Sequence, residues 1–176
     1  MWNKTYTREQ LVEYFQAVDA HLNQPIALFI IGGSAAVLQG VWEQGTQDVD
    51  VLNATDMDAF RSAEALARKT TSIFVPVTPC TIADLPYNYE DRLTRLDLPL
   101  KNLQLFCADV HDVALAKLVA FRDKDVEFIE TLHSRGVLKK TVLVERYHAE
   151  MTHAITDMDR LKTSFEILIE QLPDEG

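Results

Sequence analysis

Two aspartates spaced two residues apart, Asp48 and Asp50, are the side chains of this sequence with the clearest chemical use. They open a stretch, residues 48–52, in which acidic and apolar residues alternate, a pattern typical of a β-strand. Residues two apart on a strand point to the same side, with Cα atoms about 6.5 Å apart. Paired carboxylates can hold Mg²⁺, which activates an attacking hydroxyl and neutralises a leaving pyrophosphate. For Asp-Val-Asp taken alone, a solvent-exposed strand face is the alternative interpretation.

A glycine-rich turn precedes this strand. Gly32, Gly33 and Ser34 follow a continuous apolar run over residues 26–31, which is typical of a strand covered on both faces. Ser34 is expected to cap a short helix over residues 35–39. Backbone N–H groups at such a turn can approach a phosphate closely, and the helix N-terminus adds its positive dipole end. The alternative is a tight corner with a purely structural role.

The elements that position these residues are indicated by apolar spacing. Thr7 and Gln10 have the spacing of a capping box, and apolar residues then recur at helical intervals up to Leu22. Asp56 is expected to begin a second helix. A strand is expected over residues 73–77, followed by irregular chain because prolines recur in this region.

The remaining elements divide the chain into two parts. Residues 93–98 and 103–107 are predicted to form two antiparallel strands joined by a short turn. Helices are expected from there onward, over residues 109–121, 124–132, 140–152 and 157–172. We therefore expect a single domain over residues 1–176, with a mixed α/β core over about 1–108 and a helical C-terminal portion over about 109–176.

The composition limits the possible partners. The chain has 27 acidic and 17 basic residues, a formal charge of −10, which opposes broad attraction to nucleic acid and argues against a role on genomic DNA. No signal peptide or membrane-spanning stretch is evident, so we expect no membrane association and a cytoplasmic location. Cys80 and Cys107 lack metal-ligand spacing and are expected to be buried free thiols.

The two motifs occur together in an order that resembles a known superfamily. Ile31-Gly32-Gly33-Ser34 followed after thirteen residues by Asp48-Val49-Asp50-Val51 is similar to the signature of the DNA polymerase beta-like nucleotidyltransferases. More narrowly, residues 46–51 resemble the Thr-Arg-Asp-Ile-Asp-Val of compact bacterial nucleotidyltransferases related to abortive-infection and toxin-antitoxin enzymes. Gln47 stands where those families often have arginine, so the resemblance does not assign a phosphate or substrate contact to this position.

A second signature lies downstream. Residues 112–125 resemble a pattern of these families in which an acidic residue precedes Leu-x-x-Lys-Leu and then Arg-Asp-x-Asp. The resemblance implies that Lys117 contacts nucleotide phosphates and that Asp125 assists at the site. The alternative is a surface ion-pair network between two helices.

The resemblance also implies a third metal carboxylate, on a strand beside the Asp-x-Asp strand. Asp97 is our candidate, because Leu96, Leu98 and Leu100 alternate onto one face and leave Asp97 on the other. Asp91, or no acid at all, are the alternatives.

Taken together, the resemblance implies a nucleotidyltransferase fold, an α/β (α+β) mixed sheet flanked by helices. The implied activity is Mg²⁺- or Mn²⁺-dependent transfer of a nucleoside monophosphate from an NTP to a hydroxyl of tRNA, protein or a small molecule. A toxin-antitoxin or defence role, with a cognate toxin or antitoxin as partner, is also implied. The alternative is a catalytically inactive binding or regulatory module that keeps the fold.

Overall fold

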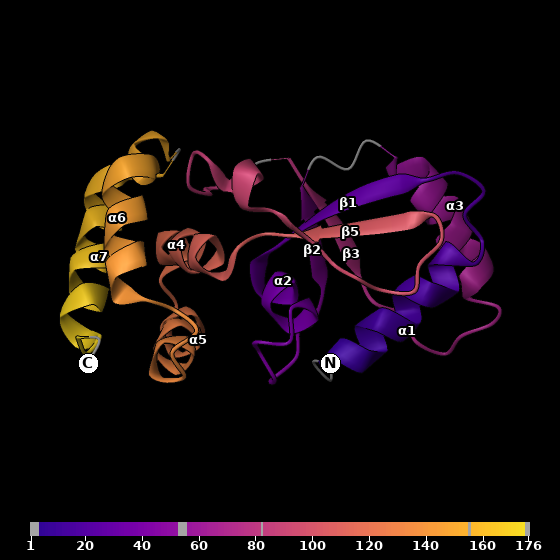
Figure 1. Cartoon of the computed structure of the whole chain (residues 1–176), viewed down its shortest axis with the longest axis horizontal. Helices are drawn as coiled ribbons and strands as arrows, with labels where there is room; N and C mark the ends of the chain where they lie inside the picture. Colours follow the sequence, from indigo (N-terminus) through magenta and orange to yellow (C-terminus); the bar gives the residue numbers. More distant parts are fainter. Residues whose placement is uncertain (1–3, 53–55, 82, 155, 175–176) are drawn as a thin grey trace. The chain divides into compact units, whose positions relative to one another are not determined.

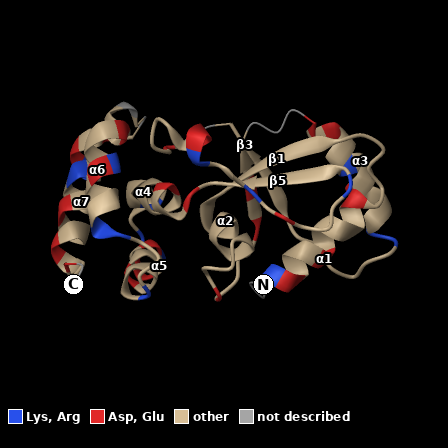
Figure 2. Cartoon of the chain, in the orientation of Figure 1, with Lys and Arg blue, Asp and Glu red and all other residues tan. Residues whose placement is uncertain are grey.

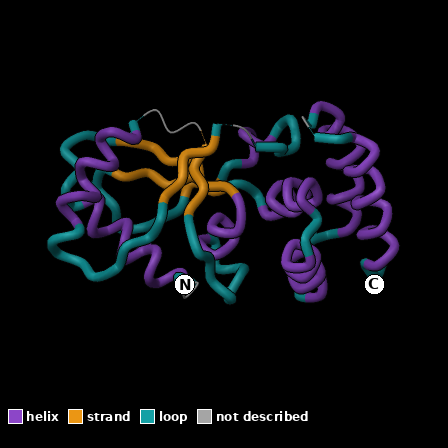
Figure 3. The backbone as a smooth tube through the Cα atoms, turned by 180° about the vertical axis from the view of Figure 1, so that it is seen from behind, coloured by secondary structure: helices purple, strands orange, loops and turns teal. Residues whose placement is uncertain are grey.

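The computed structural model describes residues 4–52, 56–81, 83–154 and 156–174. In these residues the chain forms seven α-helices, two short 3-10 helices and five strands (Figures 1 and 3). They form two compact units, unit 1 with Met1–Ile82 and Leu93–Ala108, and unit 2 with Ala83–Arg92 and Asp109–Gly176. The fold is therefore α+β with helices at the C-terminus, as the sequence predicts. Ala83–Arg92 lies in unit 2, although the sequence places it within the 1–108 portion.

Unit 1 is built on a mixed sheet. Its strands are β1 (Ile26–Ile31), β2 (Val49–Leu52), β3 (Val77–Cys80), β4 (Thr94–Arg95) and β5 (Leu103–Cys107). In the described residues the strand order is β3-β2-β1-β5-β4. The pairs β1–β5 and β2–β3 are parallel, whereas β1–β2 and β4–β5 are antiparallel. The predicted mixed sheet is confirmed.

The two faces of this sheet differ in burial. Leu28, Ile30, Val49, Val51 and Leu105 share one face and are almost fully buried. The helices of unit 1 account for this burial; they are α1 (Arg8–Asp19), α2 (Gly32–Leu38) and α3 (Met57–Ala67). Helix α1 contacts both α2 and α3, and α2 contacts three strands (Figure 1). On the opposite face, half-exposed residues are interspersed with buried ones, and Asp50 belongs to that face.

Local sequence signals set several boundaries. Thr7 and Gln10 form the expected capping box at the start of α1. The continuous apolar run forms β1 over the predicted residues. The expected strand over residues 73–77 is wrong, because β3 begins only at Val77 and contains Pro79. Proline is tolerated there because β3 is an edge strand.

The turn between β4 and β5 is tied to the end of α1. The Asp19 carboxylate accepts backbone N–H groups of Lys101, Asn102 and Leu103 at 2.7, 2.7 and 2.6 Å. Asp19 is buried, and these bonds compensate for the loss of water around its carboxylate. The predicted antiparallel pair is confirmed, although β4 is shorter than the sequence suggests.

Unit 2 is helical. Its α-helices are α4 (Val110–Ala120), α5 (Asp123–Ser134), α6 (Lys140–Glu150) and α7 (Met158–Gln171), and its 3-10 helices are η1 (Tyr89–Arg92) and η2 (Met151–His153). Helix α4 contacts α5, α6 and α7. Among the described helices of the whole chain, none combines the length and the apolar character that crossing a membrane requires.

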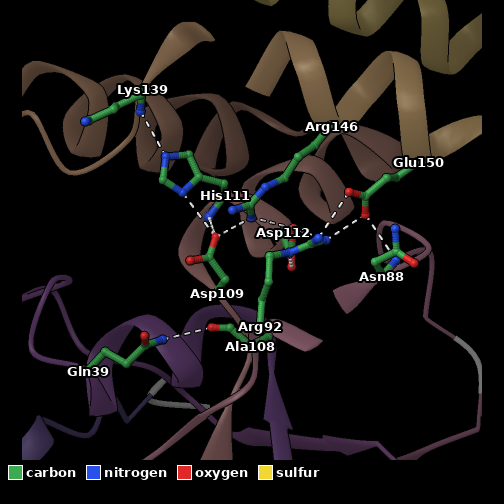
Figure 4. A network of polar contacts seen from close by, with 10 residues as sticks. All are labelled: Gln39, Asn88, Arg92, Ala108, Asp109, His111, Asp112, Lys139, Arg146 and Glu150. Carbon is green, nitrogen blue, oxygen red and sulfur yellow. Dashed lines mark hydrogen bonds and ion pairs between the residues drawn. The ribbon is translucent and has the colours of Figure 1, made fainter. Parts of the chain in front are cut away.

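An ion-pair network joins the elements of unit 2 (Figure 4). Arg92 donates to both carboxylate oxygens of Asp112, at 2.9 and 3.0 Å, and to both oxygens of Glu150, at 3.1 and 2.7 Å. Arg146 donates to Asp109 at 2.6 Å and to Asp112 at 2.8 Å. The Asp112 side chain is 0% exposed, and the two arginines offset the cost of removing its carboxylate from water. The network therefore fixes η1 and α6 against the start of α4.

Glu150→Gln is expected to lower the free energy of unfolding by about 1 to 2 kcal/mol at pH 7, because it removes a charged partner of Arg92. Hydrogen bonds from Arg92 lower the pKa of Glu150. The contribution is therefore complete above the unfolded-state pKa of about 4.3 and is lost as the pH falls through and below that value. Urea denaturation followed by circular dichroism should show the difference from wild type shrinking between about pH 5 and pH 3.

The exposed Glu145, on the same helix, provides the matched control. Glu145→Gln should leave the free energy of unfolding nearly unchanged at every pH. A Glu150→Gln difference that stays constant over the acidic range would contradict the proposed charge dependence.

Candidate functional site

Asp48 and Asp50 lie at and within strand β2. Asp48 is exposed immediately before the strand, and Asp50 is a half-buried residue inside it. Because successive side chains on a strand alternate between its faces, Asp50 shares its face with position 48. Asp50 is paired with Ile31 of β1 on one side and with Thr78 of β3 on the other. The second aspartate is thus held in the interior of the sheet, whereas the first is accessible at its margin.

The glycine turn lies directly against Asp50. Gly32, which follows β1, has a φ of +65°, a conformation that side chains rarely adopt. A Cβ atom at Gly32 would lie 3.2 Å from Asp50 Oδ2. Glycine is therefore favoured for two reasons, the backbone angle and the close approach of the carboxylate. The two halves of the first signature meet at this point.

Gly33 differs from Gly32, because neither its backbone angle nor its neighbours explain why the residue is glycine. Gly33 has no positive φ, and a Cβ atom there would meet Thr46 Oγ1 at 3.9 Å, an ordinary contact. Glycine inside a helix is less stable than alanine by roughly 0.5 to 1 kcal/mol. A larger residue would fit at position 33, so packing gives no reason for the open space beside Thr46.

Ser34 does not cap α2, contrary to the prediction. Helix α2 begins at Gly32, so Ser34 is already inside its first turn, and Ile31 is the residue at the cap position. The buried Ser34 hydroxyl donates to the Ile31 carbonyl at 3.0 Å. The glycine conformation lets the chain enter the helix directly after β1, and this is why no separate turn precedes it.

Cys80 is a neighbour of Asp50 that the sequence did not indicate. Its Sγ lies 3.7 Å from Asp50 Oδ1, and the thiol donates to the carboxylate. Burial, together with the negative charge of Asp50, raises the pKa of the Cys80 thiol. Cys107 is a buried free thiol as predicted, whereas Cys80 is only half-buried. Because prolines surround β3, the sequence predicted irregular chain where this strand places Cys80 beside Asp50.

Asp97 does not lie on a strand beside β2, and this expectation is wrong. It follows β4, which pairs only with β5 at the opposite edge of the sheet from β3. Three strand spacings, about 14 Å, separate β4 from β2. The alternation of leucines correctly predicted that Asp97 lies on the more exposed side of this segment. Alternation carries no information about which strands are neighbours in the sheet, and the error arose there.

The other sources of a third carboxylate are equally limited. Asp91 belongs to η1 in unit 2 and not to a strand. The two strands beside β2, which are β1 and β3, are fully described and contain no acidic residue. Over the described residues, no group of three or more His, Cys, Asp or Glu side chains is arranged to hold a metal ion.

Lys117 and Asp125 are brought together in unit 2. Lys117 Nζ lies 2.9 Å from Asp125 Oδ1, and Arg122 Nε lies 2.7 Å from Asp125 Oδ2. The Asp125 side chain is 0% exposed, and burial would raise its pKa, but hydrogen bonds from Arg122 and Lys117 lower it. The interhelical ion pair that the sequence offers as the alternative is present, with the carboxylate buried instead of at the surface.

Charge around the first signature is sparse. Helix α2 carries no charged residue, and the acidic and basic residues of the chain are distributed over the other helices and loops (Figure 2). The carboxylates of Asp48 and Asp50 are therefore the charged groups that the signature itself provides. Carboxylate oxygens are the ligands that Mg²⁺ and Mn²⁺ prefer, so the donor set fits such an ion.

Comparison with protein families gives a match to the family described as Nucleotidyltransferase of unknown function (DUF6036), over residues 9–172. No curated protein and no solved structure matched the chain. The matched region includes both signatures and nearly all of the described elements. The chain therefore belongs to this family of nucleotidyltransferases.

Proposed function

We propose that this protein transfers a nucleoside monophosphate from an NTP to an acceptor hydroxyl, using a divalent ion held by Asp48 and Asp50. The observation that carries the proposal is the close approach of Gly32 to Asp50, where a Cβ atom on the glycine would lie only 3.2 Å from the carboxylate. This approach joins the two halves of the signature. Membership of a nucleotidyltransferase family supports the general reaction.

Each residue of the first signature has a distinct part in this proposal. Asp48 and Asp50 supply carboxylate oxygens, and Mg²⁺ or Mn²⁺ bound there would neutralise phosphate charge and activate the hydroxyl. Gly32 and Gly33 keep side chains away from the phosphate path. Ser34 holds the turn through its bond to Ile31, which leaves backbone N–H groups for the nucleotide.

Lys117 and Asp125 are proposed to act as a pair. The Lys117 side chain is 18% exposed, and its ammonium group is paired with Asp125, which orients it. We assign Lys117 to contact with nucleotide phosphates and Asp125 to the positioning of Lys117. Arg122 neutralises the second oxygen of Asp125, so the aspartate stays ionised and paired.

The acceptor, the partners and the location are proposals from the resemblance. The acceptor classes are tRNA, protein side chains and small molecules. A toxin-antitoxin or defence role, with a cognate toxin or antitoxin, and a cytoplasmic location stay predictions.

A second candidate function is nucleotide binding without turnover. It is favoured by one observation, the absence of an acidic residue on the strands beside β2 within the described sheet. Two carboxylates provide less negative charge for binding metal ions than the three carboxylates that are usual in the superfamily. Pyrophosphate release by the full chain, measured with each NTP and Mg²⁺ or Mn²⁺ in the presence of bulk tRNA, separates the candidates. Tight NTP binding with no pyrophosphate release would favour the binding module.

Asp48→Asn and Asp50→Asn are each expected to weaken metal-dependent NTP binding at least about tenfold, because each removes a charged oxygen ligand. Isothermal titration calorimetry with Mg²⁺ and NTP measures this effect. Asp97→Asn, which changes an exposed aspartate at the other edge of the sheet, is the matched control and should bind normally. Unchanged binding by both Asp48→Asn and Asp50→Asn would rule out the assignment.

Gly33→Ala separates a ligand role from a structural role. Because the new methyl group has room and suits a helix, the variant should be at least as stable as wild type, by up to about 0.5 kcal/mol. The same methyl group should obstruct the phosphate and raise the dissociation constant for NTP about tenfold, equivalent to about 1.4 kcal/mol. Thermal unfolding and calorimetry provide the two measurements. A stable variant with normal NTP affinity would show that the space at Gly33 is not used.

Lys117→Ala should raise the NTP dissociation constant, and Lys117→Arg should restore it only in part, because a planar guanidinium differs from an ammonium point charge. Equilibrium binding of a fluorescent NTP analogue measures both variants. Lys124→Ala, at an exposed lysine of α5, serves as the control for loss of one positive charge. If Lys117→Ala lowers stability but binds the analogue as tightly as Lys124→Ala does, the lysine has a structural role alone.

A further inference from the structure

The peptide group between Leu138 and Lys139, which precedes α6, contacts a histidine at each end. Its N–H, from Lys139, donates to His111 Nε2 at 3.0 Å (Figure 4). Its carbonyl oxygen, from Leu138, lies 3.1 Å from His133 Nδ1. Both histidines belong to unit 2, His111 on α4 and His133 on α5. The two rings are therefore linked through a single peptide group.

The contacts of His111 require one ring proton. Its Nε2 accepts the Lys139 N–H, and its Nδ1 lies 3.1 Å from the acceptor Asp109 Oδ1. A single proton, on Nδ1, satisfies both contacts. A second proton, on Nε2, would face the Lys139 N–H and break that hydrogen bond. The surroundings of His111 therefore fit the neutral ring.

The contacts of His133 require two ring protons. Its neighbours are backbone carbonyl oxygens, that of Leu138 at 3.1 Å from Nδ1 and that of Pro173 at 3.0 Å from Nε2. A carbonyl oxygen only accepts, whereas neutral imidazole has one N–H and presents a lone pair at its other nitrogen. In the neutral ring, one of the two contacts is therefore between two acceptors and is repulsive. Protonation gives each nitrogen a hydrogen to donate, and both bonds are then charge-assisted.

Pro173 lies in the segment that follows α7, residues 172–174. Lys140 binds the same segment, because its Nζ donates to the Leu172 carbonyl at 2.9 Å and to the Asp174 carboxylate at 2.7 Å. The hydrogen bond from Lys140 lowers the pKa of Asp174, so this ion pair keeps its charge over the range in which histidine side chains titrate. The segment is thus held by one contact that is independent of pH in this range and by one, to His133, that depends on it.

The charged groups around His133 come from each neighbouring element. On α5, the exposed Glu130 lies one helical turn earlier. Lys139, before α6, and Asp174, after α7, line the same cavity as the imidazole. On the α4 side, the neutral His111 lies beyond the shared peptide group. Lys139 disfavours protonation of the ring and the two carboxylates favour it, so the two carbonyl contacts are what distinguish the protonated from the neutral form.

We propose that His133 is a pH-dependent latch for residues 172–174, closed when its imidazole is protonated and weakened when it is neutral. Because both carbonyl contacts are satisfied only in the protonated ring, docking of the segment strengthens as the pH falls from about 8 to about 5. Pro173 and Asp174 line a cavity of about 610 Å³ together with His133. Release of the segment therefore widens this cavity. No residue of the latch belongs to the proposed nucleotide site, so the latch is an addition to the proposed function.

Hydrogen exchange of the Leu172 amide tests the latch, because this amide donates to the Leu168 carbonyl at the end of α7 and is exposed when the segment opens. Protection factors, corrected for the intrinsic effect of pH on exchange, should be at least about threefold higher at pH 5.5 than at pH 8 in wild type. His133→Gln, whose amide does not titrate, should give equal factors at both pH values. Lys140→Met should lower protection at both pH values and keep the difference between them.

His21→Gln is the matched control, because it removes a titrating histidine from unit 1 and should behave as wild type. Nitrogen chemical shifts of the His133 ring provide a second measurement, on wild type alone, and should show both ring nitrogens protonated at pH 5.5. The latch would be overturned by equal protection at the two pH values in wild type, by a pH dependence that persists in His133→Gln, or by a His133 ring with a single proton at pH 5.5.

Discussion

The pairing of β2 between β1 and β3 is the constraint on which the candidate site depends. It sets Asp50 opposite Ile31, so that the first residue after β1 meets the carboxylate. Glycine is favoured at that position, because a positive φ strains other residues and a Cβ atom would lie 3.2 Å from the carboxylate. A shift of the register by one residue would turn Asp50 to the buried face and separate it from both Gly32 and Cys80. The first signature therefore depends on the register of β1 and β2 as well as on the chemistry of its side chains.

Much of unit 1 was predictable because its signals are local. The apolar run of β1, the capping box of α1 and the antiparallel pairing of β4 with β5 each depend on residues close in sequence. Strand order is not local, and this explains the error over Asp97: a strand beside β2 was needed, but β4 pairs with β5. Edge position also explains β3, where Pro79 is compatible with a strand that has one unpaired side.

Ion pairs between residues far apart in the chain could not be predicted from the sequence either. The motif that contains Asp112, Lys117 and Asp125 was identified, and an ion pair of Lys117 with Asp125 was the alternative interpretation, but the partners of Asp112 were not predicted. Asp112 is neutralised by Arg92, twenty residues earlier, and by Arg146, far later in the chain. Both Asp112 and Asp125 are fully buried, and their basic partners offset the cost of removing each carboxylate from water. The second signature thus contributes buried ion pairs to the structure of unit 2, in addition to its proposed role toward nucleotide. The Lys117 ammonium also lies 4.9 Å from the centre of the Phe128 ring.

The composition of unit 2 has a consequence for how the chain can be divided. Ala83–Arg92 is separated from Asp109–Gly176 by Leu93–Ala108, which belongs to unit 1. Arg92 and Asp112 are thus in contact in unit 2, although the β4–β5 hairpin of unit 1 lies between them in the sequence. A C-terminal fragment starting at Asp109 would contain the buried Asp112 without one of its two arginines. A fragment of residues 109–176 alone therefore lacks one of the ion pairs that hold the helices of unit 2 together. Completion of unit 2 thus requires two segments that are distant in the chain, and joining them closes a loop that carries the β4–β5 hairpin, at a cost in chain entropy.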